Sequence, residues 1–237
     1  HISNGVNIKE AVGLDKLEIA DDKVLSASLT DGSDINVDFV IVGIGITPNT
    51  ELAEGANLKI NNGIFINDRC QTSVSNIYAA GDCTSFEYKD TLVRLESVGN
   101  AIDQATIVAQ NIMKQNTDYI PKPWFWSDQY DLKLQIAGLN TGYDEVVVRK
   151  GESRQVSHWY YKGQSLLAVD ALNDPRCYMI GKRLIEANKS PSKNLLRYEN
   201  LNLKELWKLS FQETVINENL DKLKKQFDNA FEDIKIR

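Results

Sequence analysis

The most informative local pattern in the chain is Ile77-Tyr78-Ala79-Ala80-Gly81-Asp82. Its first four residues predict a short strand, and the chain then enters a Gly-Asp turn. Because Ala79, Ala80 and Gly81 have little or no side chain, a ligand can approach the backbone there. Asp82 offers a carboxylate that accepts hydrogen bonds from sugar-like hydroxyls, and a nearby helix N-terminus would present N–H groups to a phosphate. The plainer interpretation is an ordinary strand that ends in a turn.

The sequence on either side of this stretch extends an α/β pattern. Phe39-Val40-Ile41-Val42-Gly43 is a continuous apolar run, which is typical of a strand covered on both faces. Residues 97–114 carry apolar side chains at helical spacing and predict the clearest helix of the first half. Further short strands are expected over residues 6–12, 14–20, 24–29 and 63–66, and a helical turn over residues 51–56.

The composition shifts after Pro121 and Pro123, which mark a linker. Beyond it, strand-like runs at 132–137, 145–149, 155–161 and 165–171 precede a helix that starts after Asp174-Pro175 and covers about 176–187. This pattern indicates a small α+β domain with an antiparallel sheet. From about Leu203 the tail is charged and helical. Its apolar residues follow a heptad seam that is short for a coiled coil: Ile216, Leu220, Leu223, Phe227, Ala230 and Ile234.

Composition excludes several classes of protein. The 237 residues include 27 Lys plus Arg and 33 Asp plus Glu, a net charge of −6, which argues against a dedicated nucleic-acid binder. No apolar run reaches the roughly 18 residues of a membrane helix. Cys70, Cys83 and Cys177 are far apart and there are only two histidines, so we expect no metal site, disulfide scaffold or dithiol redox pair. Reduced cysteines favour a cytoplasmic setting.

Several motifs resemble one enzyme family. The stretch 77–82 resembles the second FAD-binding motif of two-dinucleotide-binding flavoprotein oxidoreductases, and residues 40–50 resemble their return from the NAD(P)H domain to the FAD domain. The motif Glu96-Ser97-Val98-x-Asn100-Ala101-x-x-Gln104-Ala105 and the block Trp124-Phe125-Trp126-Ser127-Asp128-Gln129-Tyr130 are similar to the ferredoxin-reductase group. That group includes putidaredoxin, rubredoxin-type and dioxygenase reductases. The resemblance runs from residue 1 to about Trp207.

This resemblance implies an α/β fold, with a partial FAD/NAD(P)-binding Rossmann-like region followed by a small α+β C-terminal reductase domain. The implied domains are a remnant of the NAD(P)H-binding domain, the C-terminal half of the FAD-binding domain, the C-terminal domain and a helical tail, at residues 1–47, 48–120, 121–209 and 210–237. A complete member carries two Gly-x-Gly-x-x-Gly turns. Neither is present here, so we expect a C-terminal portion that binds neither dinucleotide tightly alone.

The resemblance also implies roles for particular residues around FAD. Gly81 and Asp82 should hold FAD. Ser97 and Val98 begin the long helix, and the backbone N–H of Val98 should lie near the pyrimidine edge of the flavin, where it would stabilise negative charge. Trp126 should lie against the isoalloxazine ring; the alternative is a core aromatic.

Two more residues are implied to lie on the nicotinamide side. Glu96 should lie near the nicotinamide-binding face, or else be a solvated loop carboxylate. Gly45 should leave room for NAD(P)H at the domain junction, or else be a plain turn glycine. Val98-Gly99 departs from the family's helix-start motif: Gly99 costs helix propensity but could widen the site.

The implied activity is hydride transfer from NAD(P)H to FAD, followed by single-electron transfer to a ferredoxin- or rubredoxin-like iron–sulfur protein. The cofactor carries this chemistry, so no catalytic side-chain nucleophile is required. Two alternatives remain open. One is a non-catalytic dimerisation or docking module formed by residues 121–209 and the tail. If the chain is a reductase, the same C-terminal region could form a homodimer. The other is an NADH oxidoreductase similar to apoptosis-inducing factor. We expect no nucleic-acid or membrane partner.

Overall fold

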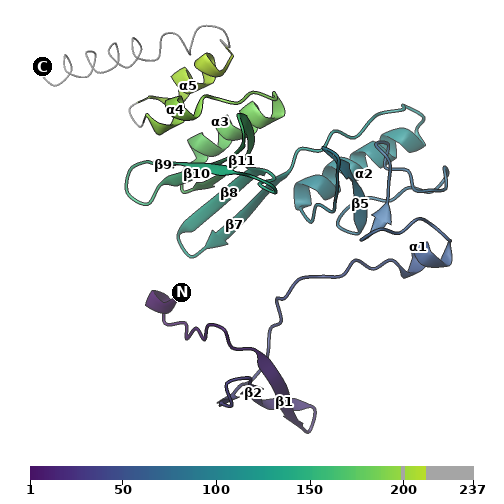
Figure 1. Cartoon of the computed structure of the whole chain (residues 1–237). Coiled ribbons are helices and arrows are strands. Elements are labelled where there is room, and N and C mark those ends of the chain that lie inside the picture. The colour runs from purple at the N-terminus through teal and green to yellow at the C-terminus, as the bar shows by residue number, and fades with distance from the viewer. Residues whose placement is uncertain (199–200, 212–237) are drawn as a thin grey trace, which may run out of the picture. The chain divides into compact units, whose positions relative to one another are not determined.

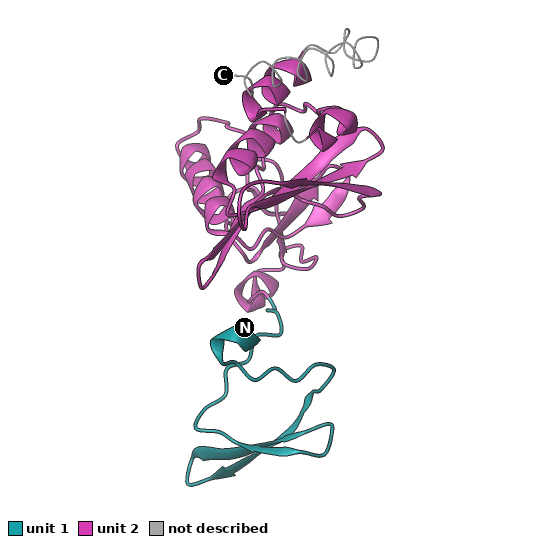
Figure 2. Cartoon of the chain, turned by 90° about the vertical axis from the view of Figure 1, so that its left-hand side faces the viewer, with its two compact units in different colours: residues 1–47 teal, residues 48–237 magenta. Residues whose placement is uncertain are grey.

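The computed structural model describes residues 1–198 and 201–211. The chain forms two compact units, His1–Thr47 and Pro48–Arg237, which Figure 2 colours separately. The predicted heptad seam of the tail, at residues 216–234, lies outside the described residues. No helix among the described residues is long and apolar enough to cross a membrane.

The first unit is a small antiparallel meander. After a 3₁₀ turn at Ile2–Asn4 it consists of three strands in the order β1-β2-β3: β1 (Leu14–Ala20), β2 (Lys23–Leu29) and β3 (Asp34–Asn36). Asp21 and Asp22 connect β1 to β2 with φ values of 51° and 60°, the left-handed conformation that tight two-residue hairpins use. The predicted hairpin is therefore confirmed.

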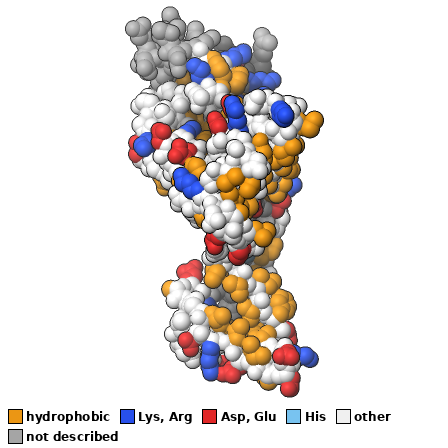
Figure 3. All heavy atoms as spheres, turned by 90° about the vertical axis from the view of Figure 1, so that its right-hand side faces the viewer, with side chains coloured by type: hydrophobic (Ala, Val, Ile, Leu, Met, Phe, Trp, Pro, Cys, Tyr) orange, Lys and Arg blue, Asp and Glu red, His pale blue; other side chains and the backbone are white. Residues whose placement is uncertain are grey.

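Two strands predicted in this unit are wrong. Residues 6–12 and 39–43 have no regular secondary structure, and Phe39, Ile41 and Val42 are 71%, 85% and 66% exposed. Figure 3 shows apolar side chains gathered on the surface of this part of the chain. A strand needs a neighbour for its N–H and C=O groups. Within residues 1–198 and 201–211, no segment pairs with 39–43, so apolar sequence alone does not produce a strand there.

The second unit begins with a mixed α/β region. Its elements are α1 (Glu51–Gly55), β4 (Ile64–Phe65), β5 (Thr84–Tyr88), β6 (Thr91–Val93) and α2 (Val98–Ile112). Strand β5 pairs with β4 in parallel and with β6 antiparallel. These elements surround a small core in which Phe86 meets Tyr119 edge to face, with ring centroids 5.6 Å apart. The helix predicted over 97–114 is confirmed.

The strand predicted over residues 77–80 is wrong. Only Tyr78 makes an isolated bridge, to Gln71, and the regular strand β5 follows the Gly81–Asp82 turn instead of preceding it. The side chain of Thr72 explains this geometry, because its hydroxyl donates to the backbone oxygens of Val74 and Ile77 and folds this segment into a compact loop.

The C-terminal part of the second unit is a five-stranded antiparallel sheet with helices on one face (Figure 1). The strands are β7 (Trp124–Gln129), β8 (Leu132–Gly138), β9 (Glu145–Lys150), β10 (Val156–Lys162) and β11 (Ser165–Leu172), in the order β7-β8-β11-β10-β9. The helices are α3 (Pro175–Glu186), α4 (Lys193–Arg197) and α5 (Leu203–Ser210). All four predicted strands and the predicted helix are confirmed; β7 was not predicted.

The large core of the molecule lies between this sheet and its helices. Trp159 and Val169 on the sheet and Leu184 on α3 are fully buried in it. Gly181 allows α3 to approach the sheet, because a Cβ at this position would lie 2.6 Å from a methyl carbon of Val169. At the edge of this sheet, β7 packs against the neighbouring α/β region through Phe125.

Candidate cofactor-binding site

The Gly81–Asp82 turn is anchored to helix α2. Gly81 has a φ of 89°, which favours glycine. Its N–H donates to Oε1 of Gln104 at 2.7 Å, and an added Cβ would lie 3.6 Å from Ala101 Cβ. The next residue, Asp82, is exposed. A fixed backbone therefore presents a solvent-facing carboxylate that can accept hydrogen bonds from a ligand's hydroxyl groups.

The N-terminus of α2 supplies free backbone donors beside this turn. Ser97 is the N-cap, and its Oγ accepts from the N–H of Asn100 at 3.2 Å. The N–H groups at the very start of a helix have no acceptor within the helix, and the helix dipole gives this end partial positive charge. Val98, the first helical residue, is 56% exposed. The helix start can therefore stabilise a negatively charged group.

A pair of tryptophans from β7 lies against the same helix start. Trp124 and Trp126 stack with ring centroids 5.3 Å apart, and Trp126 is 48% exposed. A Cβ on Gly99 would lie 2.8 Å from Cε2 of Trp124, so only glycine lets this ring pack so closely. The space that Gly99 leaves is therefore filled by Trp124, and the prediction that Gly99 widens the site is wrong.

Most of the predicted site residues therefore lie in, or are held by contacts to, the first two turns of α2. They are Gly81, Asp82, Ser97, Val98 and Trp126. Glu96 immediately precedes them; it is exposed and pairs with Nη2 of Arg94 at 2.6 Å. Gly45 belongs to the first unit, where it has a φ of 100° and an added Cβ would meet open space. Its proposed role toward NAD(P)H stays a prediction.

Buried donors without acceptors fit a ligand rich in oxygen. Arg94, whose side chain is 12% exposed, has Nε and Nη1 buried with no protein partner in the described part of the chain. The side chain of Arg94 and the backbone of Cys83, the residue after Asp82, both lie next to Gly63. A Cβ added to Gly63 would lie 2.8 Å from Cys83 O and 3.3 Å from Arg94 Cδ. Buried donors need acceptors, and the phosphates and carbonyls of FAD are acceptors. The residues present therefore fit FAD.

Arg94 is a candidate ligand-binding residue that sequence reasoning missed. The only signal was its position two residues before the Glu96-Ser97 helix start. In the described residues, no group of His, Cys, Asp and Glu side chains comes together as metal ligands.

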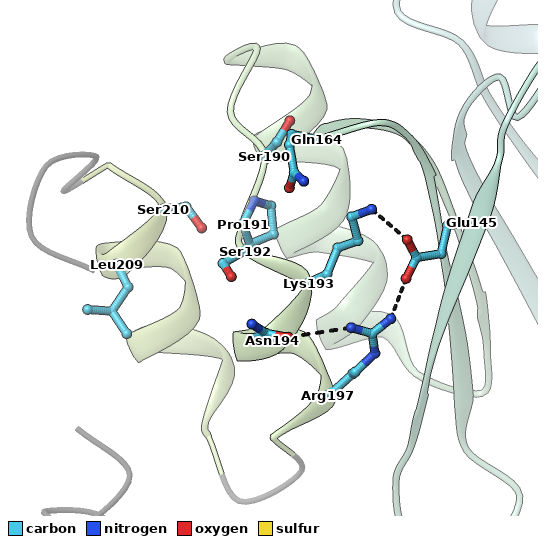
Figure 4. Close-up of a pocket in the computed structure, with 10 residues that line it drawn as sticks. All are labelled: Glu145, Gln164, Ser190, Pro191, Ser192, Lys193, Asn194, Arg197, Leu209 and Ser210. Atoms are coloured by element: carbon cyan, nitrogen blue, oxygen red, sulfur yellow. Dashed lines mark hydrogen bonds and ion pairs between the residues drawn. The ribbon is translucent and has the colours of Figure 1, made fainter. Parts of the chain in front are cut away.

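A separate polar cavity of about 690 Å³ lies at the far end of the α+β domain, beside α4 (Figure 4). Its charged groups pair with one another: Glu145 accepts from Lys193 at 2.5 Å and also pairs with Arg197. The hydrogen bond from Lys193, with the positive charges of both partners, lowers the pKa of the Glu145 carboxyl. The ion pairs hold α4 against β9, which makes this cavity a structural feature of the domain.

Comparison with known proteins matches both parts of the chain. The family model described as pyridine nucleotide-disulphide oxidoreductase matches residues 1–105, and the one described as reductase C-terminal matches residues 124–207. Rhodocoxin reductase of Rhodococcus erythropolis is 39% identical over 188 residues, which are 78% of this chain and 44% of that protein. Putidaredoxin reductase of Pseudomonas putida is 39% identical over 211 residues, 87% of this chain and 50% of that protein.

Solved structures agree with these matches. The covalent complex of putidaredoxin reductase with putidaredoxin contains a chain with 38% identity and a TM-score of 0.83, and the match covers 90% of this chain and 52% of that one. The ferredoxin reductase for the CYP199A2 system of Rhodopseudomonas palustris gives 34% identity and a TM-score of 0.80. That match covers 86% of this chain and 51% of that one. The chain spans about half the length of the relatives it matches. It belongs to the family of FAD-dependent ferredoxin reductases that includes the putidaredoxin, rhodocoxin and rubredoxin reductases.

Proposed function

We propose that residues 1–237 form the FAD-contacting C-terminal half of an NAD(P)H:ferredoxin-type reductase that passes electrons to a ferredoxin- or rubredoxin-like iron–sulfur protein. One observation carries the proposal: helix α2 holds the Gly81–Asp82 turn on one side and the Trp124–Trp126 pair on the other, with its own N-terminus exposed. When bound, FAD would accept a hydride from NAD(P)H and release the electrons one at a time.

The protein's part in this function is to bind and orient the cofactor. Asp82 accepts hydrogen bonds from hydroxyl groups of its sugar-phosphate arm. Gly81 keeps the backbone close enough for that contact, and the helix start at Ser97 and Val98 offers its N–H groups to the electron-rich edge of the flavin. Trp126 covers the ring and keeps water away from it.

On the nicotinamide side we propose Glu96 and Gly45 as neighbours of NAD(P)H. Glu96 is exposed beside the helix start, and its partner Arg94 fixes its direction. Gly45 contributes an open, side-chain-free position in the first unit.

The domain assignment follows the same proposal. Residues 1–47 would be the remnant of the NAD(P)H domain, 48–120 the C-terminal half of the FAD domain, 121–209 the C-terminal reductase domain and 210–237 a tail. A rubredoxin-like or ferredoxin-like partner is proposed because relatives are named as reductases of putidaredoxin and rubredoxin. The cytoplasm is proposed as the location, because Cys70, Cys83 and Cys177 are all unpaired. Homodimerisation through residues 121–237 is a prediction that analytical ultracentrifugation tests.

The test is to express the full natural polypeptide that carries these residues. We expect a yellow protein with flavin absorption bands that NADH or NADPH bleaches under anaerobic conditions, and that then reduces a rubredoxin or a [2Fe–2S] ferredoxin. A folded polypeptide that stays colourless after FAD is added would refute the proposal. If that colourless protein also self-associates, the result would favour the dimerisation or docking module.

A further inference from the structure

The buried side chains of helix α2 are amides, whereas its apolar residues at the core, Ile107 and Val108, are only partly buried. Its buried residues are Asn100, Gln104 and Asn111, whereas Ile102 and Ile112 are each 61% exposed. A buried amide is costly unless its donors and acceptors are used, so each of these side chains should perform a specific task.

Two of the three amides hold neighbouring loops. The Oδ1 of Asn100 accepts from the hydroxyl of Tyr119 at 2.5 Å, and its Nδ2 donates to the carbonyl of Leu95 at 3.0 Å. The amide of Asn111 accepts from the N–H of Thr117 at 2.7 Å and donates to its carbonyl at 2.8 Å. Both ends of these two side chains are used, which is the pattern of an ordinary structural amide.

Gln104 has a different pattern. It is fully buried, and its Oε1 accepts from the N–H of Gly81 at 2.7 Å. The same Oε1 lies 3.0 Å from the hydroxyl of Thr84, which shares its single proton between Gln104 and the carbonyl of Gly81. The Nε2 end is buried without a partner in the described residues. The orientation of the amide is set by its partner, because a backbone N–H can only donate. Gln104 thus leaves one end unsatisfied in order to hold the turn with the other.

The turn that Gln104 holds is the one that presents Asp82. Thr84 reinforces it, because its hydroxyl also lies 2.8 Å from the carbonyl of Gly81. One helix therefore carries two ligand-facing features: its own N-terminus at Val98 and, through Gln104, the Asp82 carboxylate. Among the described residues, the hydrogen bonds that join this turn to α2 both run to one side-chain oxygen, Oε1 of Gln104.

We propose that Gln104 is a positioning residue for FAD, which fixes the Gly81–Asp82 turn on helix α2 and so sets the affinity for the cofactor without touching it. This inference rests on the proposed function. It predicts that removing the Gln104 acceptor weakens FAD binding while the fold and the α2 N-terminus stay in place.

The test compares substitutions in the full natural polypeptide, prepared as apoprotein and titrated with FAD by flavin fluorescence. Gln104→Met keeps the length of the side chain and removes the acceptor; we expect the Kd for FAD to rise about tenfold or more. Gln104→Glu keeps an oxygen for Gly81 and should bind FAD more tightly than Gln104→Met. Gln110→Met, the same change farther along α2, is the matched control and should leave the Kd within about twofold.

A second readout separates positioning from general destabilisation. Amide hydrogen exchange at Gly81, measured without FAD, should accelerate in Gln104→Met and stay at the wild-type rate in Gln110→Met. If Gln104→Met does not fold, Thr84→Val, which removes one of the two donors to Gln104, should give a smaller increase in the same Kd.

The proposal is overturned if wild type binds FAD and the variants at Gln104 or Thr84 bind it as tightly as the Gln110 control. That outcome leaves the reductase function intact. A wild-type polypeptide that does not bind FAD would instead refute the reductase function itself.

Discussion

The two units of the molecule contain similar apolar sequence but bury very different amounts of it. In residues 1–47, all of which the structure describes, Ala27 is the only buried side chain, although the segment includes Phe39 and Ile41. In the second unit the strands are covered by helices, and side chains such as Trp159 and Leu184 are completely inaccessible. A strand pattern therefore becomes a strand only where another segment pairs with it: β1, β2 and β3 pair with one another although β1 and β3 are largely exposed, whereas residues 39–43 pair with no segment among the described residues.

The two units are also stabilised by different interactions. The second unit is stabilised by burial of apolar surface. The first depends on its hairpin hydrogen bonds and on polar contacts in its turns, such as those between Lys9 and Asp31. Its exposed apolar surface is an aggregation hazard when uncovered.

Truncating the core should affect stability far more than truncating the exposed run. Trp159→Ala removes a fully buried ring and should lower the free energy of unfolding by about 3–5 kcal/mol. Ile41→Ala, at a position 85% exposed, should change it by less than about 0.5 kcal/mol. Urea denaturation followed by circular dichroism measures both, and comparable losses would contradict the contrast.

The far end of the second unit depends on one buried cation. The guanidinium of Arg149 donates to the carbonyls of Leu196 and Leu201, each at 2.9 Å, and ties the helical segment to β9. Arg149→Met leaves these acceptors unsatisfied and should reduce stability by about 2–3 kcal/mol. Lys150→Met, at the exposed neighbouring position, is the control; a similar cost there would show that Arg149 has no special role.

Adding one methyl group should matter only where the chain is closely packed. Gly99→Ala forces the Trp124 ring away from α2 and should cost about 1–3 kcal/mol, with a shift in tryptophan fluorescence. Gly43→Ala, in the first unit, meets nothing within 4 Å and should be nearly neutral. An unchanged fluorescence spectrum in Gly99→Ala would contradict the packing described for the site.

The smallest effect is a pH dependence in the first unit. Hydrogen bonds from the side chain and backbone of Ser33, with Lys9, lower the pKa of Asp31 to about 2. Since the folded pKa lies below the ordinary value of 3.8, the contribution is complete above pH 3.8 and is lost as pH falls through about 2. An NMR titration should show this midpoint, and Asp31→Asn should lower the melting temperature at pH 7 but not at pH 1. A midpoint near 3.8 would contradict the turn geometry.

Local signals made much of the fold predictable from the sequence. The hairpin at Asp21-Asp22 and the helix after Asp174-Pro175 are encoded within a few residues, since Asp174 itself caps α3 by accepting from the N–H of Cys177. The strands of the α+β domain alternate clearly enough to be placed. The prediction at 39–43 failed because a strand needs a pairing partner that the local sequence does not reveal, and the prediction at 77–80 failed because the nearby Thr72 hydroxyl folds that segment into a loop.

The candidate site was predictable only in part, because some of its residues act through contacts that the local sequence does not show. The motifs identified the turn and the helix start, because glycine, aspartate and an N-cap serine have recognisable local roles. The role of Gln104 was not visible, since it depends on the N–H of Gly81, far away in the sequence. The role of Arg94 was not visible, since its local sequence does not show that its Nε and Nη1 are buried without partners in the described residues. Buried polar side chains are where sequence patterns carry the least information.

In the proposed function, the Gly81–Asp82 turn and the start of α2 together hold FAD. The most direct measurement is the FAD dissociation constant of Asp82→Ala in the full natural polypeptide, compared with Asp90→Ala, which removes an exposed carboxylate in the β5–β6 turn. We predict that Asp82→Ala weakens FAD binding about tenfold or more, whereas Asp90→Ala binds as wild type does. Equal affinities for the two variants would contradict the account.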